Sequence, residues 1–117
     1  MNVKDNKDWT VLMWASWYNS PEVAKLLLES GVDVNAQSSK GNTALMFAAV
    51  NNSSAVARFL LEADADVNAR DKCGKTALRW TATYNSADGA RLLLAAGEDI
   101  NAKDNDGKTA LMSAAAD

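Results

Sequence analysis

Histidine is absent from the 117 residues, and cysteine and proline occur once each. Without histidine the chain lacks the commonest general base and the commonest metal ligand. The single cysteine, Cys73, cannot form a disulfide within the chain, which excludes a disulfide framework and is typical of a reducing compartment. The composition therefore argues against histidine-assisted catalysis and against a small disulfide-linked fold.

Long apolar runs and clusters of basic residues are also missing. No apolar stretch is long enough to cross a bilayer, and the polar N-terminus MNVKDNKD has no signal-like apolar segment. The net charge is −3 and the twelve lysines and arginines are scattered, so there is no basic footprint for nucleic acid. Glycine-rich phosphate loops and calcium loops are absent too. We expect a cytoplasmic protein with no cofactor, no metal, no membrane contact and no nucleic-acid partner.

What the chain does contain is one unit repeated at a fixed interval. The segments NAQSSKGNTAL, NARDKCGKTAL and NAKDNDGKTAL occupy residues 35–45, 68–78 and 101–111, and a degenerate copy, NVKDNKDWTVL, occupies 2–12. Four threonines mark the register without insertion or deletion, 33 residues apart: Thr10, Thr43, Thr76 and Thr109. Self-similarity at one period indicates stacked copies of one structural unit.

Each copy predicts a polar turn followed by two short helices. The threonine is an N-cap ahead of about two helical turns, such as ALMFAAV at 44–50. Serines cap the second helices, whose apolar residues recur at helical spacing; these serines are Ser20, Ser53 and Ser86. Left-handed residues should end the helices: Asn19, Asn52 and Asn85 after the first, and Gly31, Asp64 and Gly97 after the second.

Two helices this short cannot bury their apolar faces alone, so each unit must pack on the next. We therefore expect an all-α solenoid in a single domain, 1–117, with units at about 5–37, 38–70 and 71–103 and a partial unit at 104–117. Gly89 stands where the other units have valine, which removes a core side chain and weakens the helix. The last unit lacks its second helix, which favours a fragment or an engineered chain over an intact natural one.

The repeated pattern Asp-x-x-Gly-x-Thr-Ala-Leu-Met-x-Ala-Ala, then Val-x-x-Leu-Leu-Leu-x-x-Gly-x-Asp-Val-Asn-Ala, resembles the ankyrin repeat over essentially the whole chain. The resemblance implies an L-shaped helix-turn-helix unit with β-hairpin-like loop tips, inner helices that form a concave face, and a scaffold for partner proteins. Two positions depart from the family pattern Thr-Pro-Leu-His. Alanine or valine replaces the proline, and the histidine is replaced by Met13, Met46, Arg79 and Met112. We expect methionine to fill the space of the missing ring.

Aromatic residues gather at the positions that vary in the resembling family: the loop tips, the residue before the threonine and the exposed face of the first helix. All four tryptophans and both tyrosines lie there. Trp14, Phe47 and Trp80 are one repeat apart, so the resemblance implies a stripe of rings on the concave face. Clustered tryptophan and tyrosine are typical of binding hot spots. We predict a partner-binding surface made of Trp9, Trp14, Trp17, Tyr18, Phe47, Asn51, Trp80 and Tyr84, with Lys72, Cys73 and Lys75 at a loop tip.

Other interpretations of the same residues remain open. The rings could be core packing between neighbouring first helices. They could instead form a cage for a methylated lysine or another small cation, with a carboxylate from Asp5, Asp8 or Glu22. A homodimer through the aromatic face or the open repeat ends is a third alternative. Catalysis is the least favoured, because Cys73 has no histidine to activate it.

Overall fold

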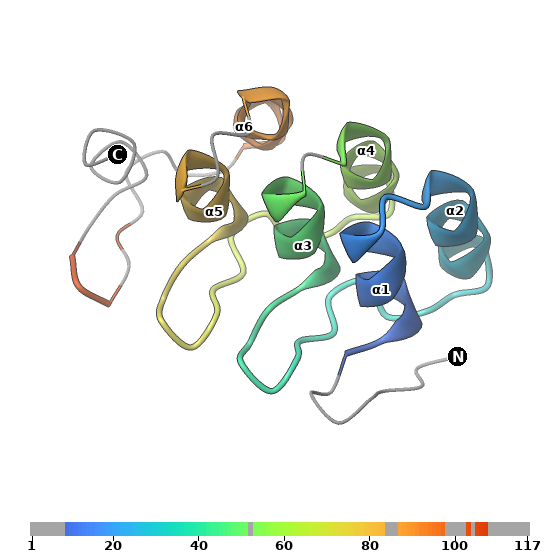
Figure 1. Cartoon of the computed structure of the whole chain (residues 1–117), viewed down its shortest axis with the longest axis horizontal. Coiled ribbons are helices and arrows are strands. Elements are labelled where there is room, and N and C mark those ends of the chain that lie inside the picture. Colours follow the sequence, from blue (N-terminus) through green and yellow to red (C-terminus); the bar gives the residue numbers. More distant parts are fainter. Residues whose placement is uncertain (1–8, 52, 84–86, 98–102, 104, 108–117) are drawn as a thin grey trace.

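Three pairs of helices stack side by side in the computed structural model, which describes residues 9–51, 53–83, 87–97, 103 and 105–107 (Figure 1). Within these residues there are six helices and no strand: α1 (Val11–Trp17), α2 (Pro21–Glu29), α3 (Ala44–Val50), α4 (Ser54–Glu62), α5 (Ala77–Thr83) and α6 (Ala87–Ala95). The first helices of the pairs pack on one another in one layer, and the second helices form a layer beside it. The all-α stacked architecture is confirmed. In the described part of the chain no helix has the length and hydrophobicity to span a bilayer.

The first helices begin where the threonines predict. Oγ1 of Thr10 accepts the backbone N–H of Met13 at 3.2 Å, and Oγ1 of Thr43 accepts that of Met46 at 3.3 Å. Each methionine sulfur in turn accepts the N–H of its threonine, at 3.3 and 3.5 Å. Both methionines are fully buried. Methionine therefore fills the space of the missing ring, as expected, and also completes the cap.

Ser20 and Ser53 occupy the N-cap positions of α2 and α4, as the sequence predicts. Their ψ angles are 78° and 74°, far from the 165° of Thr10, and neither hydroxyl accepts an early helical N–H. The Ser53 hydroxyl donates instead to the carbonyl of Ser16, 3.3 Å away in the preceding unit. Ser86 lies outside the described residues.

The helix ends follow the predicted left-handed residues. Asn19 has φ of 52° and Asp64 has φ of 66°, and each follows the C-cap residue of its helix, α1 and α4 respectively, as predicted. A non-glycine residue in this region costs roughly 1–2 kcal/mol, so the surrounding contacts hold these two turns. Asn52 and Asn85 lie outside the described residues.

The core runs continuously through the units. Leu12, Leu45 and Leu78 are buried at the same register of α1, α3 and α5, beside alanines that let these helices approach closely. On α4, Val56 is fully buried, whereas its counterpart Val23 on α2 is 45% exposed because no described unit packs on that side of α2. Gly89 occupies the same register on α6 and is also buried, so the core of the third unit does lack a side chain there.

Candidate functional site

Three aromatic rings lie around Trp9, the residue before the first N-cap, and a fourth stacks on one of the three. Its ring centroid lies 4.1 Å from that of Phe47, 4.5 Å from that of Trp14 and 5.6 Å from that of Trp17. Trp14 stacks on Tyr18 at 5.8 Å, and Trp17 meets Phe47 edge-on at 5.9 Å. We call these five residues the aromatic cluster. It joins the first unit to the second, since Phe47 belongs to α3, whereas Trp14 and Trp17 lie on α1 and Trp9 and Tyr18 flank that helix.

The rings of the aromatic cluster differ in exposure. Tyr18 is 68% exposed and Trp17 is 38% exposed, and both tryptophans at 9 and 14 are half-buried. Phe47, by contrast, is only 6% exposed, so the expectation of a ring on the free surface was wrong for this residue. The reason is Trp9, whose ring covers it. Core packing is thus the right interpretation for Phe47, while the indoles keep surface in contact with solvent.

Trp80 occupies the same register on α5 but is held by polar groups. Its indole Nε1–H donates to Oδ2 of Asp71 at 3.1 Å, and the ammonium of Lys75 lies 4.9 Å from its ring centroid. The hydrogen bond fixes the indole against the loop that precedes α5. A cation above the ring face is attracted by the π electrons, so Lys75 is restrained too.

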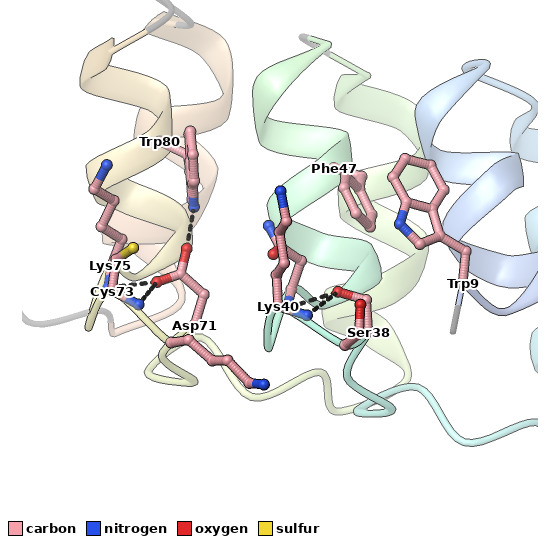
Figure 2. A pocket seen from close by; sticks show the side chains of 11 residues that line it. Trp9, Ser38, Lys40, Phe47, Asp71, Cys73, Lys75 and Trp80 are labelled. Carbon is pink, nitrogen blue, oxygen red and sulfur yellow. Dashed lines mark hydrogen bonds between the residues drawn. The ribbon is translucent and has the colours of Figure 1, made fainter. Parts of the chain in front are cut away.

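A cleft of about 550 Å³ lies between the aromatic cluster and the loop tips (Figure 2). Trp9 and Phe47 stand on one side of it and Trp80 on the other, with the loops that hold Ser38 and Asp71 below. The described lining consists of Trp9, Ser38, Ser39, Lys40, Asn42, Phe47, Asp71, Lys72, Cys73, Lys75 and Trp80. The cleft therefore combines ring faces with lysines and backbone groups of two neighbouring loops.

Each loop is ordered by a polar side chain at its first position. Oδ1 of Asp71 accepts the backbone N–H groups of Cys73 and Lys75 at 2.9 and 3.0 Å. In the preceding loop Oγ of Ser38 accepts those of Lys40 and Asn42 at 3.3 and 3.1 Å. These short local bonds close the turns, as the polar loop sequences predict.

Removing the Asp71 carboxylate should loosen the cleft. Asp71→Ala leaves three N–H donors without their acceptor, and we expect a loss of about 1–3 kcal/mol in the free energy of unfolding. Asp71→Ser should recover most of this loss, because serine at Ser38 makes the two backbone bonds in the equivalent loop. Urea unfolding of the two variants measures the difference. Equal destabilisation by alanine and serine would show that the turn bonds contribute nothing.

Neighbouring loops are tied to each other by backbone bonds. The N–H of Lys72 donates to the carbonyl of Lys40 at 3.0 Å, and the N–H of Asn105 donates to that of Cys73 at 2.9 Å. The side chain of Asn105 also donates to the carbonyl of Lys72, at 2.9 Å. The loop tips therefore form a connected edge, in which hydrogen bonds hold the backbones of Lys40 and Lys72 in place.

The predicted site residues divide into three groups. Trp9, Phe47, Lys72, Cys73, Lys75 and Trp80 line the cleft, and Trp14, Trp17 and Tyr18 adjoin it through the aromatic cluster. Asn51 has a bond between units, since its carboxamide donates to the carbonyl of Trp17 at 2.6 Å. Tyr84 lies outside the described residues.

Sequence reasoning missed five residues of the lining: Ser38, Ser39, Lys40, Asn42 and Asp71. The 33-residue register holds the signal that could have found three of them. Ser39 and Lys40 stand one repeat before Lys72 and Cys73, and Asn42 stands at the position of Trp9 and Lys75. Residues at the same repeat position in neighbouring units are expected to lie on the same face of the stack.

The stacked pairs, the capping threonines and the tied loops all recur with the unit. A family model described as ankyrin repeats, in three copies, matches residues 1–71 and 66–117. The chain belongs to the ankyrin repeat family. Members of this family are in general protein–protein interaction modules and typically not enzymes. A search of curated proteins found no match for this ankyrin repeat chain.

Proposed function

We propose that this ankyrin repeat protein binds a partner protein through the aromatic cluster and the adjoining cleft, without catalysis. The observation that carries the proposal is the convergence of five aromatic rings beside a cleft of about 550 Å³. Tryptophan and tyrosine dominate binding hot spots, because they offer large contact areas with few rotatable bonds. Rings and loops already held by packing and hydrogen bonds lose little entropy on docking.

A displayed-peptide library tests the proposal. Binders selected on the wild-type chain should lose at least about 30-fold in affinity for Trp14→Ala/Trp17→Ala, because hot-spot residues each contribute about 2 kcal/mol or more. Trp17→Ala alone should weaken binding in the same direction. Leu94→Ala is the matched control, since Leu94 is exposed to a similar degree, 41% against 38%, but lies on α6.

Helical circular dichroism of all variants must match that of the wild type. Binders that tolerate the loss of both tryptophans, or that respond equally to Leu94→Ala, would place recognition elsewhere on the protein. Loss of binding in step with unfolding would instead favour a purely structural role for the rings. In that case the single variant Trp17→Ala decides between a recognition role and a structural role, because Trp17 is more exposed than Trp14.

The charges of the described lining disfavour the cation-cage alternative. The rings do converge, but the cleft contains three lysines and one carboxylate, Asp71. Glu22 is exposed on α2 and does not line the cleft, and Asp5 and Asp8 lie outside the described residues. A trimethyllysine peptide should therefore leave the tryptophan fluorescence unchanged at millimolar concentration.

Self-association is a second candidate, favoured by the exposed apolar side chains of α2. Val23 is 45% exposed and Leu26 is 64% exposed, whereas Val56, the counterpart of Val23, is fully covered in the next unit. A second copy that packed on α2 would bury both residues. Light scattering tests this directly. Self-association is supported if the mass of the wild type rises with concentration while that of Leu26→Glu stays monomeric. A wild-type mass that stays monomeric at all concentrations rejects it.

A further inference from the structure

The cleft carries a charge opposite to that of the whole chain. Its described lining contains Lys40, Lys72 and Lys75 and a single carboxylate, Asp71, on a protein whose net charge is −3. The other described acidic residues lie elsewhere, with Glu22, Glu29 and Glu62 on α2 and α4. The cleft therefore has a local excess of positively charged side chains beside the aromatic rings.

The one carboxylate of the cleft is already occupied. Asp71 is 9% exposed, and its two oxygens accept three N–H groups, from the backbones of Cys73 and Lys75 and from the indole of Trp80. A carboxylate with this many donors has little remaining capacity for a ligand cation. Asp71 therefore organises the cleft and does not set its preference for a ligand.

The lysine ammonium groups are available. Lys40 and Lys72 are exposed at neighbouring loop tips, and among the described residues no carboxylate pairs with either. Lys75 lies over the Trp80 ring, which attracts it without neutralising its charge. Lys40 and Lys72 thus have no ion pair among the described residues that would compete with a ligand, and Lys75 keeps its charge beside the Trp80 ring.

We propose that the cleft binds an acidic peptide segment of the partner protein, in which carboxylates flank an aromatic or aliphatic side chain. The apolar side chain lies against Trp9 and Trp80, and the carboxylates meet Lys40 and Lys72. The volume of about 550 Å³ falls in the range of pockets that enclose a small ligand, which suits a short stretch of peptide. This inference rests on the proposed function, because it names the chemistry of the partner at the same surface.

A nucleic acid fits these observations less well. Tight binding to a phosphate backbone needs a basic surface that follows the strand for several phosphates. The cleft offers three lysines, and exposed carboxylates lie elsewhere among the described residues, including Asp33, Asp64 and Asp66. Charge complementarity over so small an area suits a few carboxylates of one peptide.

Selection from an unbiased displayed-peptide library separates this inference from the function on which it rests. Binders that depend on Trp14 and Trp17 should be enriched in aspartate and glutamate next to an apolar residue. Cleft-dependent binders that are neutral or basic would overturn the acidic preference and leave the proposed function standing. A library with no tryptophan-dependent binder would overturn both.

Matched charge variants supply the second measurement, with a selected acidic peptide as the probe. Lys40→Gln/Lys72→Gln should weaken binding about tenfold at low ionic strength, and the loss should shrink as salt screens the charges. Lys25→Gln/Arg58→Gln removes the same charge from exposed positions of α2 and α4 and should change affinity less than about twofold. Neither cleft lysine uses its ammonium in a described ion pair, so both double variants should keep the wild-type circular dichroism.

Two outcomes would overturn the acidic-peptide inference. Equal losses from both double variants would mean that only the overall charge of the protein matters. An oligouridylate that binds the wild type more tightly than the acidic peptide, with the same dependence on Lys40 and Lys72, would make the cleft a nucleic-acid site.

Discussion

Replacing Leu60 by alanine should lower the free energy of unfolding by about 2–5 kcal/mol, the range for a fully buried leucine. Leu60 has no exposed surface and lies on α4, the central helix of the second layer, which contacts α2, α3 and α6. The truncation leaves a cavity at a buried position of the helix that packs on its own unit and on both neighbours. In a stack held by nearest-neighbour interfaces, damage to the central unit also uncouples the outer ones.

Leu26→Ala is the control for this prediction, because it makes the same chemical change on α2 at a residue that is 64% exposed. We expect it to cost less than about 0.5 kcal/mol. Urea unfolding followed by helical circular dichroism measures both variants, and the Leu60 variant should also show a shallower transition. Similar losses for the two leucines would contradict the burial pattern.

Gly41→Ala should destabilise the protein by several kcal/mol, about 3 or more, for two separate reasons. Gly41 has φ of +80°, a conformation that costs an alanine roughly 1–2 kcal/mol. A Cβ at this position would also lie 2.9 Å from the Cα of Asp71 and 2.9 Å from the backbone nitrogen of Lys72. Because these are backbone atoms, the neighbouring loop would have to move as a whole.

Gly31→Ala separates the two effects. Gly31 has nearly the same φ, +83°, but a Cβ there would meet nothing within 4 Å. Its replacement should therefore cost only the conformational term, roughly 1–2 kcal/mol. Gly41→Ala should in addition weaken the binding of a selected cleft-dependent peptide, because it disturbs the hydrogen bond from the N–H of Lys72 to the carbonyl of Lys40. Equal stabilities, with peptide affinity unchanged in both, would contradict the close approach of the two loops.

Much of the helical unit could be predicted because its signals act over a few residues. The bonds between Thr10 and Met13 and between Asp71 and Lys75 join residues three and four positions apart. The left-handed turns at Asn19 and Asp64 depend on a single residue each. A repeat of 33 residues then places every such element without any knowledge of its neighbours.

The candidate site was only partly predictable, because exposure depends on the adjacent unit. Trp14 and Phe47 hold the same register, and nothing in their own helices distinguishes them. Phe47 is buried because Trp9, which precedes the helix of the unit before it, lies 4.1 Å away. The Ser53 hydroxyl likewise donates to Ser16 across a unit boundary and makes no hydrogen bond to the first turn of α4, although Ser53 is its N-cap residue.

Short-range preferences thus account for the helices, their caps, their turns and the 33-residue register, since turn and helix hydrogen bonds join residues nearby in the chain. Contacts between units decided which rings stay exposed and why Lys40 belongs to the cleft beside Lys72. Those contacts join residues about one repeat apart, and their outcome depends on the size and polarity of whatever side chain the next unit presents.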